Sequence, residues 1–181
     1  MNLIDRAGRE RLLRILALLL VVGLTAALLS LHDKIQALGA WGYPGIFLVS
    51  LLTNATLILP VPGVLITSAL GAVYHPLGVA LAASSGAALG ELTGYLAGYS
   101  GQGMAQRVSR YEQIVGWMKK YGDVTILALA FIPNPAFDAA GIVAGVLKMP
   151  LHRFLLWCWL GKLLKMLAFA YGGAALARWF A

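Results

Sequence analysis

The sequence predicts an all-α integral membrane protein with an inverted repeat, two proline-broken re-entrant helical hairpins, full transmembrane helices and a cytoplasmic interfacial amphipathic helix. Of its 181 residues, 60% are hydrophobic and only 12% are charged, whereas about a quarter of the residues in a soluble domain are charged. Two apolar stretches are interrupted by Pro-x-Pro, and basic residues gather at the edges of the apolar runs. The length suits one domain.

Basic residues precede the first long apolar run, so residues 1–31 are expected to form a basic N-terminus and a first transmembrane helix. The run over 12–31 is long enough to cross a hydrocarbon core of about 30 Å, and no A-x-A-like cleavage site ends it. The positive-inside rule places the N-terminus in the cytoplasm. Such edge clusters account for the net charge of +7, so no nucleic-acid partner is expected.

Two later apolar segments are each divided by a Pro-x-Pro motif, and the pieces on either side are shorter than the ~20 residues that a spanning helix needs. Proline removes a backbone donor and ends the helix before it. Each segment therefore predicts a re-entrant hairpin of two short helices that meet at a turn inside the membrane. The first hairpin covers 45–76, with Asn54, Pro60, Pro62 and Gly63 near its tip, and the second covers 122–148, with Pro133, Asn134 and Pro135.

Uninterrupted apolar runs predict full transmembrane helices over 77–98 and 154–177. Apolar residues recur at helical spacing among basic ones over 103–121, which predicts an amphipathic helix on the cytoplasmic membrane surface. In this order the first hairpin enters from outside and the second from inside. All dense basic clusters then lie on one side, as the positive-inside rule requires. The membrane domain as a whole covers 45–177.

The two hairpins resemble each other in sequence. After its Pro-x-Pro motif, each continues to a glycine, four further residues and a Pro-Leu pair, so GAVYHPL (71–77) aligns with GVLKMPL (145–151) without a gap. Because the two hairpins enter from opposite sides, this similarity predicts an inverted-topology repeat. Paired, proline-interrupted segments in corresponding positions point to the substrate site of a transporter. The alternative is a chance pair of Pro-x-Pro motifs.

Charged side chains at membrane depth are the candidate substrate-binding or coupling residues. A charge at the bilayer centre costs about 3 kcal/mol by insertion scales, so such groups should face the protein interior or an aqueous cavity and pair. The lysines could receive a lipid phosphate or could neutralise the acids statically. The acids could handle a head group or a proton, or could serve as a structural hydrogen bond or a helix cap. These residues are Glu91, Asp138, Lys162 and Lys165.

Other residues are expected to line the site or to pack helices together. Asn54 and Asn134 lie beside the two breaks, where they satisfy freed backbone groups or line the substrate path, and Tyr95 is a further candidate for the lining of a cavity. Glycine at every fourth position makes a smooth helix face that lets another helix or hairpin approach closely. These glycines are Gly86, Gly90, Gly94 and Gly98.

Three blocks carry a family resemblance: LPVPGVLITSALG, GELTGYLAGYSGQ and FIPNPAFDAAGIVAGVLKMPLHRF. In this order, over roughly residues 45–175, the chain resembles the DedA family, also called the VTT or SNARE-associated domain. The resemblance implies two re-entrant hairpins, lipid movement that often depends on the proton-motive force, and an acid at Glu91. The charged pattern differs: Val64 follows the first Pro-Gly, where many bacterial members have an acid, and Ala130 replaces their arginine before Phe-Ile-Pro.

We therefore expect a lipid-translocating protein of the flippase or scramblase type that moves a phospholipid or a polyprenyl phosphate carrier, with or without ion or proton coupling. The alternatives are a membrane scaffolding or interaction protein without transport, and a small proton-coupled exchanger. The sequence contains no catalytic, metal-binding or cofactor motif, so we expect neither enzyme activity nor a metal or cofactor. The expected location is the bacterial cytoplasmic membrane, and a homodimer is a candidate assembly.

Overall fold

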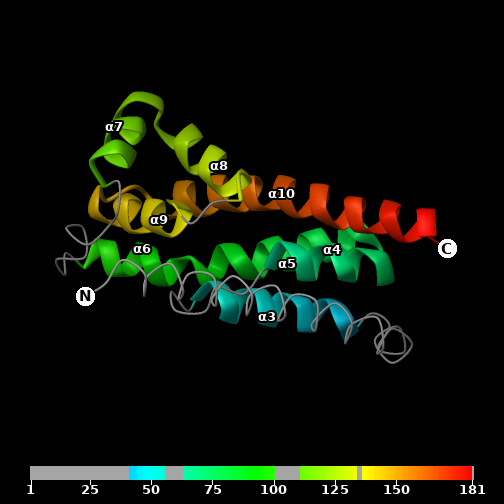
Figure 1. The fold of residues 1–181 in the computed structure, drawn as a ribbon. Helices are drawn as coiled ribbons and strands as arrows, with labels where there is room; N and C mark the ends of the chain where they lie inside the picture. Colours follow the sequence, from blue (N-terminus) through cyan, green and yellow to red (C-terminus); the bar gives the residue numbers. More distant parts are fainter. Residues whose placement is uncertain (1–40, 56–62, 101–110, 134–135, 181) are drawn as a thin grey trace, which may run out of the picture. The chain divides into compact units, whose positions relative to one another are not determined.

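In the computed structural model of the chain, residues 41–55, 63–100, 111–133 and 136–180 are described, and these residues form helices and no strands (Figure 1). The chain divides into two compact units, Met1–Gly39 and Ala40–Ala181, and the described residues all belong to the second. The predicted all-helical class is confirmed for this part, while the helix predicted over 12–31 lies outside it. The helices are α3 (Gly42–Ala55), α4 (Gly63–Val73), α5 (Pro76–Gly90), α6 (Leu92–Tyr99), α7 (Tyr111–Tyr121), α8 (Asp123–Phe131), α9 (Ala136–Val146) and α10 (Leu151–Phe180).

Each Pro-x-Pro motif lies between two short helices. Helices α3 and α4 flank 56–62, which lies outside the described residues, and α8 and α9 flank the second motif. Ile132, directly before Pro133, is extended with φ −72° and ψ 128°, because a following proline ring disfavours helical backbone. The four helices have 14, 11, 9 and 11 residues, and each is shorter than the ~20 residues of a spanning helix.

The helix predicted over 77–98 is divided at one residue in the structure. Helices α5 and α6 meet at Glu91, whose backbone is helical but flattened, with φ −65° and ψ −12°. The Thr93 hydroxyl lies 3.0 Å from the Gly90 carbonyl oxygen, a side-chain contact of a kind that bends helices. A backbone hydrogen bond still crosses the joint, from the Tyr95 N–H to the Glu91 carbonyl (3.1 Å). The two helices therefore form one rod with a local change of pitch.

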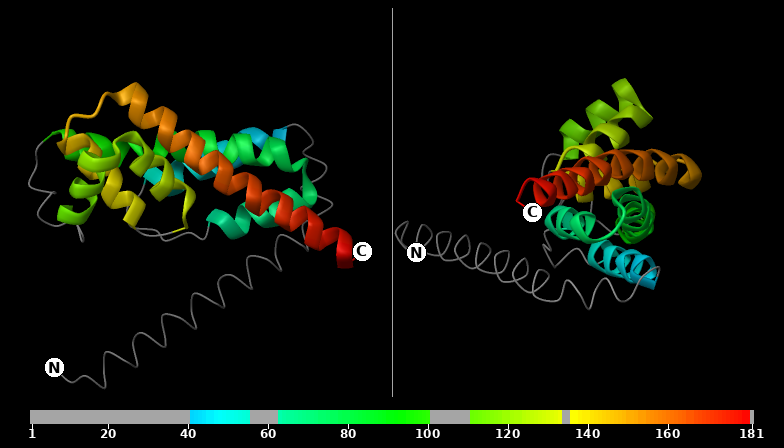
Figure 2. Two further views of the ribbon diagram at one scale, coloured as in Figure 1. Left: turned by 90° about the horizontal axis from the view of Figure 1, so that it is seen from above. Right: turned by 90° about the vertical axis from the view of Figure 1, so that its right-hand side faces the viewer.

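Helix α10 has 30 residues, more than the predicted span of 154–177, and runs antiparallel to the α5–α6 rod (Figures 1 and 2). Near the start of α10, the Tyr95 ring of α6 stacks on Phe154 with a centroid distance of 5.0 Å. Nearer its end, Met166 shares a buried cluster with Ala83 of α5. The rod and α10 thus form the centre on which the shorter helices pack.

The short helices pack in a reciprocal pattern. The first helix of each broken segment packs on the rod or helix that follows it, α3 on α5 and α8 on α10. The second packs on the corresponding element of the other segment, α4 on α10 and α9 on α6. The glycines of the repeated motif make both of these cross-contacts, because a Cβ added at Gly71 would meet the backbone of Ala170, and one added at Gly145 would meet the backbone of Tyr95.

The glycine row serves two helix contacts. Gly86 and Gly90 face α3, where an added Cβ would collide with backbone oxygens, and Gly98 meets α9 in the same way. Gly94 has more room, since the nearest atom to an added Cβ is the Asp138 carbonyl oxygen at 3.8 Å. The smooth face therefore receives the first broken segment at one end and the second at the other, as small-residue helix contacts in membranes allow.

Helix α7 packs its apolar face on the protein. Ile114, Val115 and Met118 are buried in one cluster with residues of α8, α9 and α10. Gly122 follows α7 with a φ of 59°, a left-handed conformation that glycine adopts without strain, and the turn leads directly into α8. Of the amphipathic helix predicted over 103–121, the described part begins at residue 111. Its apolar stripe is covered by protein, and its position on the cytoplasmic membrane surface stays a prediction.

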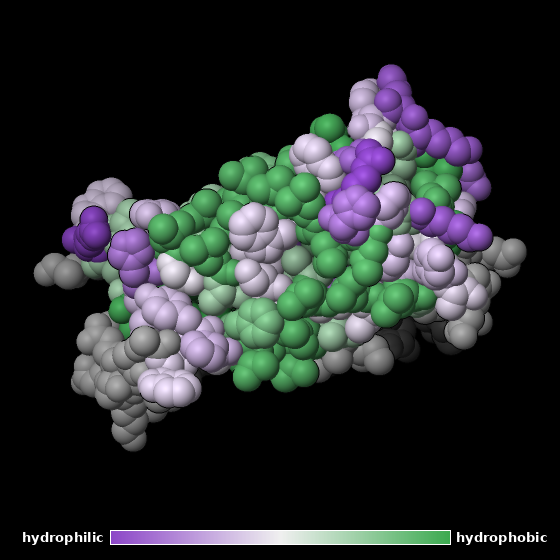
Figure 3. Space-filling model, turned by 180° about the vertical axis from the view of Figure 1, so that it is seen from behind, coloured by the Kyte–Doolittle hydropathy of each residue, from purple (hydrophilic) through white to green (hydrophobic). Residues whose placement is uncertain are grey.

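The outer surface is apolar in the middle and hydrophilic toward both ends on the face shown in Figure 3. At the end formed by α7, α8 and the start of α10, Arg153 pairs with Asp123 at 2.6 Å. Among the helices described, α10 alone is long and apolar enough to cross a membrane, by length and composition. Large apolar side chains exposed on the surface include Leu48, Leu52, Leu81, Leu96, Leu156 and Leu164.

Candidate functional site

A buried ion pair lies where the α5–α6 rod meets α10. The Lys162 Nζ is 2.7 Å from the Glu91 Oε1, and the two side chains are 4% and 5% exposed. Lys162 belongs to an i, i+4 stripe of α10 whose other members, including Phe154, Cys158 and Met166, are buried. Side chains four residues apart share one helix face, so the lysine necessarily points into the protein.

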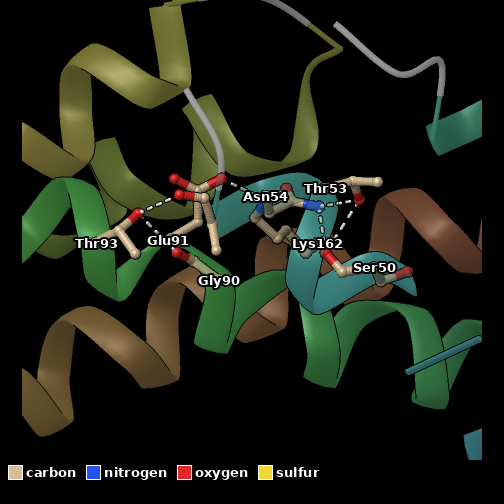
Figure 4. Close-up of polar contacts among 8 residues, drawn as sticks. Ser50, Thr53, Asn54, Gly90, Glu91, Thr93 and Lys162 are labelled. Atoms are coloured by element: carbon tan, nitrogen blue, oxygen red, sulfur yellow. Dashed lines mark hydrogen bonds and ion pairs between the residues drawn. The ribbon is translucent and has the colours of Figure 1, made fainter. Parts of the chain in front are cut away.

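Asn54, at the end of α3, is the second oxygen ligand of this lysine. Its Oδ1 accepts a hydrogen bond from the Lys162 Nζ at 2.7 Å, while its Nδ2 donates to the Ser50 carbonyl oxygen at 2.8 Å (Figure 4). The backbone bond holds the amide with its oxygen toward the ammonium. The sequence placed Asn54 beside the first break, and the structure brings it into direct contact with the charge pair.

Phe137 adds a third contact to Lys162, from the start of α9 just after the second break. The Lys162 Nζ lies 4.9 Å from the centroid of the Phe137 ring, and Phe137 is 4% exposed. An ammonium over an aromatic face is attracted by about 0.5 to 2 kcal/mol, with the larger value where water is excluded. Sequence reasoning did not identify Phe137, because in "PNPAF" it looks like an ordinary apolar residue and only its place beside the break could have marked it.

Thr93 is a further residue that the sequence analysis missed. Its Oγ1 lies 3.1 Å from the carbonyl oxygen of Ala55 and 3.0 Å from that of Gly90. Ala55 is the last residue of α3, and the final carbonyls of a helix lack partners within it. Thr93 therefore holds the end of α3 to α6 by a contact that does not involve the lysine.

The two other predicted charges surround the pair without bonding to it. Asp138 is exposed and Lys165 is half-buried. Both are close enough to Lys162 for a Coulombic interaction, but no hydrogen bond or ion pair joins either of them to another residue in the described part of the chain. The predicted cluster of four charges thus consists of a bonded inner pair and two outer groups.

The remaining predicted lining residues lie apart from the pair or outside the described ranges. The buried Tyr95 hydroxyl donates to the Met149 carbonyl oxygen at 2.6 Å, which ties α6 to the loop before α10, and its place in a cavity lining stays a prediction. Gly63 begins α4 and Pro133 is exposed. Pro60, Pro62, Asn134 and Pro135 lie outside the described residues.

The ligands of the ammonium determine what this arrangement can bind. Lys162 has three N–H donors, and it meets a carboxylate, an amide oxygen and the face of an aromatic ring. Leaving one member of a buried ion pair without its partner costs about 3–5 kcal/mol. The carboxylate of Glu91 can therefore leave the lysine only if another anionic oxygen takes its place, and a phosphate group supplies such oxygens.

Known proteins similar to the chain include membrane proteins of bacteria and plants. Residues 61–175 match the family model described as the VTT domain. Inner membrane protein YqaA of Escherichia coli (strain K12) is 32% identical over 108 residues, which make up 59% of this chain and 73% of YqaA. Vacuole membrane protein KMS2 of Arabidopsis thaliana is 40% identical over 57 residues, which make up 29% of this chain and only 14% of KMS2. No solved structure matches the chain.

Proposed function

The chain belongs to the VTT domain family, also called the DedA family, of membrane proteins, and from this premise we propose that it translocates a lipid across the membrane. The lipid is a phospholipid or a polyprenyl phosphate carrier, and the movement is of the flippase or scramblase type. One observation carries the proposal: the buried ammonium of Lys162 contacts one residue from each proline-broken segment, Asn54 and Phe137.

The proposal includes an inverted repeat in which the two broken segments are re-entrant hairpins. Ser68 and Ile142 each stand three residues before the glycine of the repeated motif. The carbonyl of Ser68 lies against Gly173 of α10, and the carbonyl of Ile142 lies against Gly98 of α6. The rod and α10 are antiparallel (Figure 1). The two glycines stand at nearly corresponding positions, 22 residues after Pro76 and 23 residues after Pro150. Such similar contacts support a two-fold relation between the halves, which is the arrangement of many transporters with a central substrate site.

In this proposal the phosphate of a lipid head group binds among the four charges while the acyl chains stay in the bilayer. Lys162 and Lys165 supply the positive charge, and Glu91 and Asp138 balance it when the site is empty. Asp138 and Lys165 are more exposed than the inner pair, so they form the layer that a head group reaches first. Charge-assisted hydrogen bonds from an ammonium to phosphate oxygens are stronger than neutral ones, which favours anionic lipids over neutral ones.

A vesicle assay tests the proposal. Purified protein in liposomes should speed the movement of a labelled phospholipid or polyprenyl phosphate between leaflets, and Lys162→Met and Glu91→Gln should abolish this activity. Ser85→Ala is the matched control, since it removes one other polar contact between α5 and α10, the 3.1 Å bond from the Trp159 indole. Unchanged rates in both charge variants would refute the site, and no movement by the unaltered protein would refute the function.

One observation favours a second candidate, a membrane scaffolding protein without transport. The Glu91 and Lys162 side chains are almost completely buried, as a purely static pair would be. Replacing a buried ion pair by apolar residues of similar volume is often neutral for stability. A scaffold should therefore keep its function when both residues are replaced together by leucine and methionine, whereas a lipid transporter should lose it. Movement of a small ion along a pH gradient, without lipid transfer, would instead indicate an exchanger.

A further inference from the structure

We propose that Lys162 is a positioning residue that ties the end of α3 and the start of α9 to α10, so that a lipid phosphate bound to its ammonium loosens both helix ends in one step. The phosphate in this inference rests on the proposed function, whereas the tie rests on the geometry alone.

Helix α3 packs mainly on α5, and α9 packs mainly on α6, so side chains make the contacts between these two helices and α10. Farther along α9, Phe154 of α10 lies beside Gly141. For α3, the polar link is the 2.7 Å hydrogen bond between Asn54 and Lys162. For α9, the Phe137 ring lies 4.9 Å from the same ammonium. Asn54 is the second-last residue of its helix and Phe137 is the second residue of its own, so both links act where the helices meet the breaks.

The contacts of Asn54 and Phe137 both end on the Lys162 Nζ. A ligand that draws this nitrogen away therefore weakens both contacts at once. A phosphate oxygen would approach the Lys162 Nζ to about 2.8 Å, and the nitrogen would move away from Glu91 and toward the phosphate. A displacement of about 1 Å takes a hydrogen bond beyond its useful range and weakens the attraction of the ring. The end of α3 and the start of α9 would therefore be loosened together, and Glu91 would lose its bond to Lys162 at the joint of the rod.

The chain offers a control contact for α3. Thr93 bonds to the Ala55 carbonyl oxygen at 3.1 Å, one residue from Asn54, and does not touch the lysine. Thr93→Val should loosen the end of α3 without changing its response to an anion. This separates a general weakening of α3 from a loss of the tie through Lys162.

Hydrogen–deuterium exchange of the full chain in nanodiscs measures the tie directly. In discs of phosphate-free galactolipid, Asn54→Leu should speed exchange at the end of α3 alone, Phe137→Leu at the start of α9 alone, and Lys162→Met at both. Losing one such contact should speed exchange roughly threefold to thirtyfold. Added phosphatidic acid should speed exchange at both sites in the unaltered protein and in Thr93→Val, with no further effect in Lys162→Met.

The outcomes separate the tie from the proposed function. Faster exchange at only one site in Lys162→Met overturns the tie, and so does equal loosening of both helices in Phe137→Leu. No response of the unaltered protein to phosphatidic acid overturns release by phosphate. If Lys162→Met does not fold because Glu91 is left unpaired, the double variant Glu91→Gln with Lys162→Met takes its place with the same expectations. Absence of lipid movement in vesicles would refute the function and leave the exchange pattern of these variants unaffected.

Discussion

Alanine substitutions along the glycine row test the close helix contacts and contain their own control. A Cβ at Gly90 would lie 2.6 Å from the Leu51 carbonyl oxygen and 2.8 Å from the Asn54 Cβ. Separations under 3.0 Å force one of the two groups to move. At Gly94 the nearest atom would be 3.8 Å away, an ordinary van der Waals contact. The two substitutions are chemically identical and differ only in the space around the new methyl group.

The expected free energies follow from two opposing terms. Alanine is more favourable than glycine in a helix by about 1 kcal/mol, and overpacking a tight contact typically costs about 1–3 kcal/mol. At Gly94 only the helix preference applies, so Gly94→Ala should stabilise the protein by up to about 1 kcal/mol. At Gly90 both the helix preference and the overpacking apply, so Gly90→Ala should leave the free energy of unfolding unchanged or lower it by up to about 2 kcal/mol. The two variants should therefore differ by about 1–3 kcal/mol in the free energy of unfolding.

Thermal unfolding of the purified protein in detergent measures this difference. For a chain of this size, 1 kcal/mol moves the midpoint by about 2–4 °C, so Gly90→Ala should melt several degrees below Gly94→Ala. Gly98→Ala should behave like Gly90→Ala, because its Cβ would collide with the Ile142 carbonyl. If Gly94→Ala lost as much stability as Gly90→Ala, the row would not make these close contacts and the reasoning would be wrong.

Three other variants test the polar contacts by the same melting assay. Lys162→Met should lower the free energy of unfolding by about 3–5 kcal/mol because it leaves the Glu91 carboxylate unpaired, and adding Glu91→Gln should recover most of that loss. If the double variant lost as much as the two single variants together, the result would contradict the pair. Tyr95→Phe should lose about 1 kcal/mol through one buried hydrogen bond, and an unchanged midpoint would mean that the bond contributes nothing. Asp123→Asn should lose less than about 1 kcal/mol, because its partner Arg153 is half exposed, and still less in high salt; a large, salt-independent loss would show a stronger coupling.

Features that depend on neighbouring residues in the sequence could be predicted. Proline ends a helix by its own covalent structure, so the short helices on either side of Pro133 follow from local chemistry. Glycine at every fourth position defines a smooth face before any partner is known. The positions of the acids and lysines within apolar segments likewise indicated that some of them turn inward, and Glu91 and Lys162 are buried.

The pairing of the charges could not be predicted. Lys162 and Lys165 are less than one turn apart, and which of them meets Glu91 depends on the rotation of α10 about its axis. That rotation is set by the buried stripe through Phe154 and Cys158, which forms only when α10 packs against the rod. The role of Phe137 could not be predicted either, because it also depends on how the helices pack. An aromatic ring becomes a cation partner only when a lysine from another helix reaches its face.

The apolar stripe of α7 shows a second limit of sequence reasoning. A stripe that faces lipid and a stripe that faces protein have the same composition and the same helical period. The choice depends on the turn at Gly122, which brings α8 back so that Ile126 shares the cluster of Ile114 and Met118. The sequence contained the glycine, but the direction in which the chain continues after a left-handed residue depends on contacts made much later in the chain.

The two halves of the chain make similar backbone contacts and carry opposite charges at one pair of corresponding positions. Glu91 and Lys165 stand equally far along the chain from Pro76 and Pro150, the prolines of the repeated motif. In the proposed repeat these positions are equivalent, and two acids or two lysines there would repel each other in a medium that screens charge poorly. Opposite signs avoid this cost and concentrate the positive charge on α10, which also carries Lys162. In the proposed function, a head-group phosphate arriving from either end of the bundle would therefore meet the lysines of α10, although the backbone contacts at the two ends are similar.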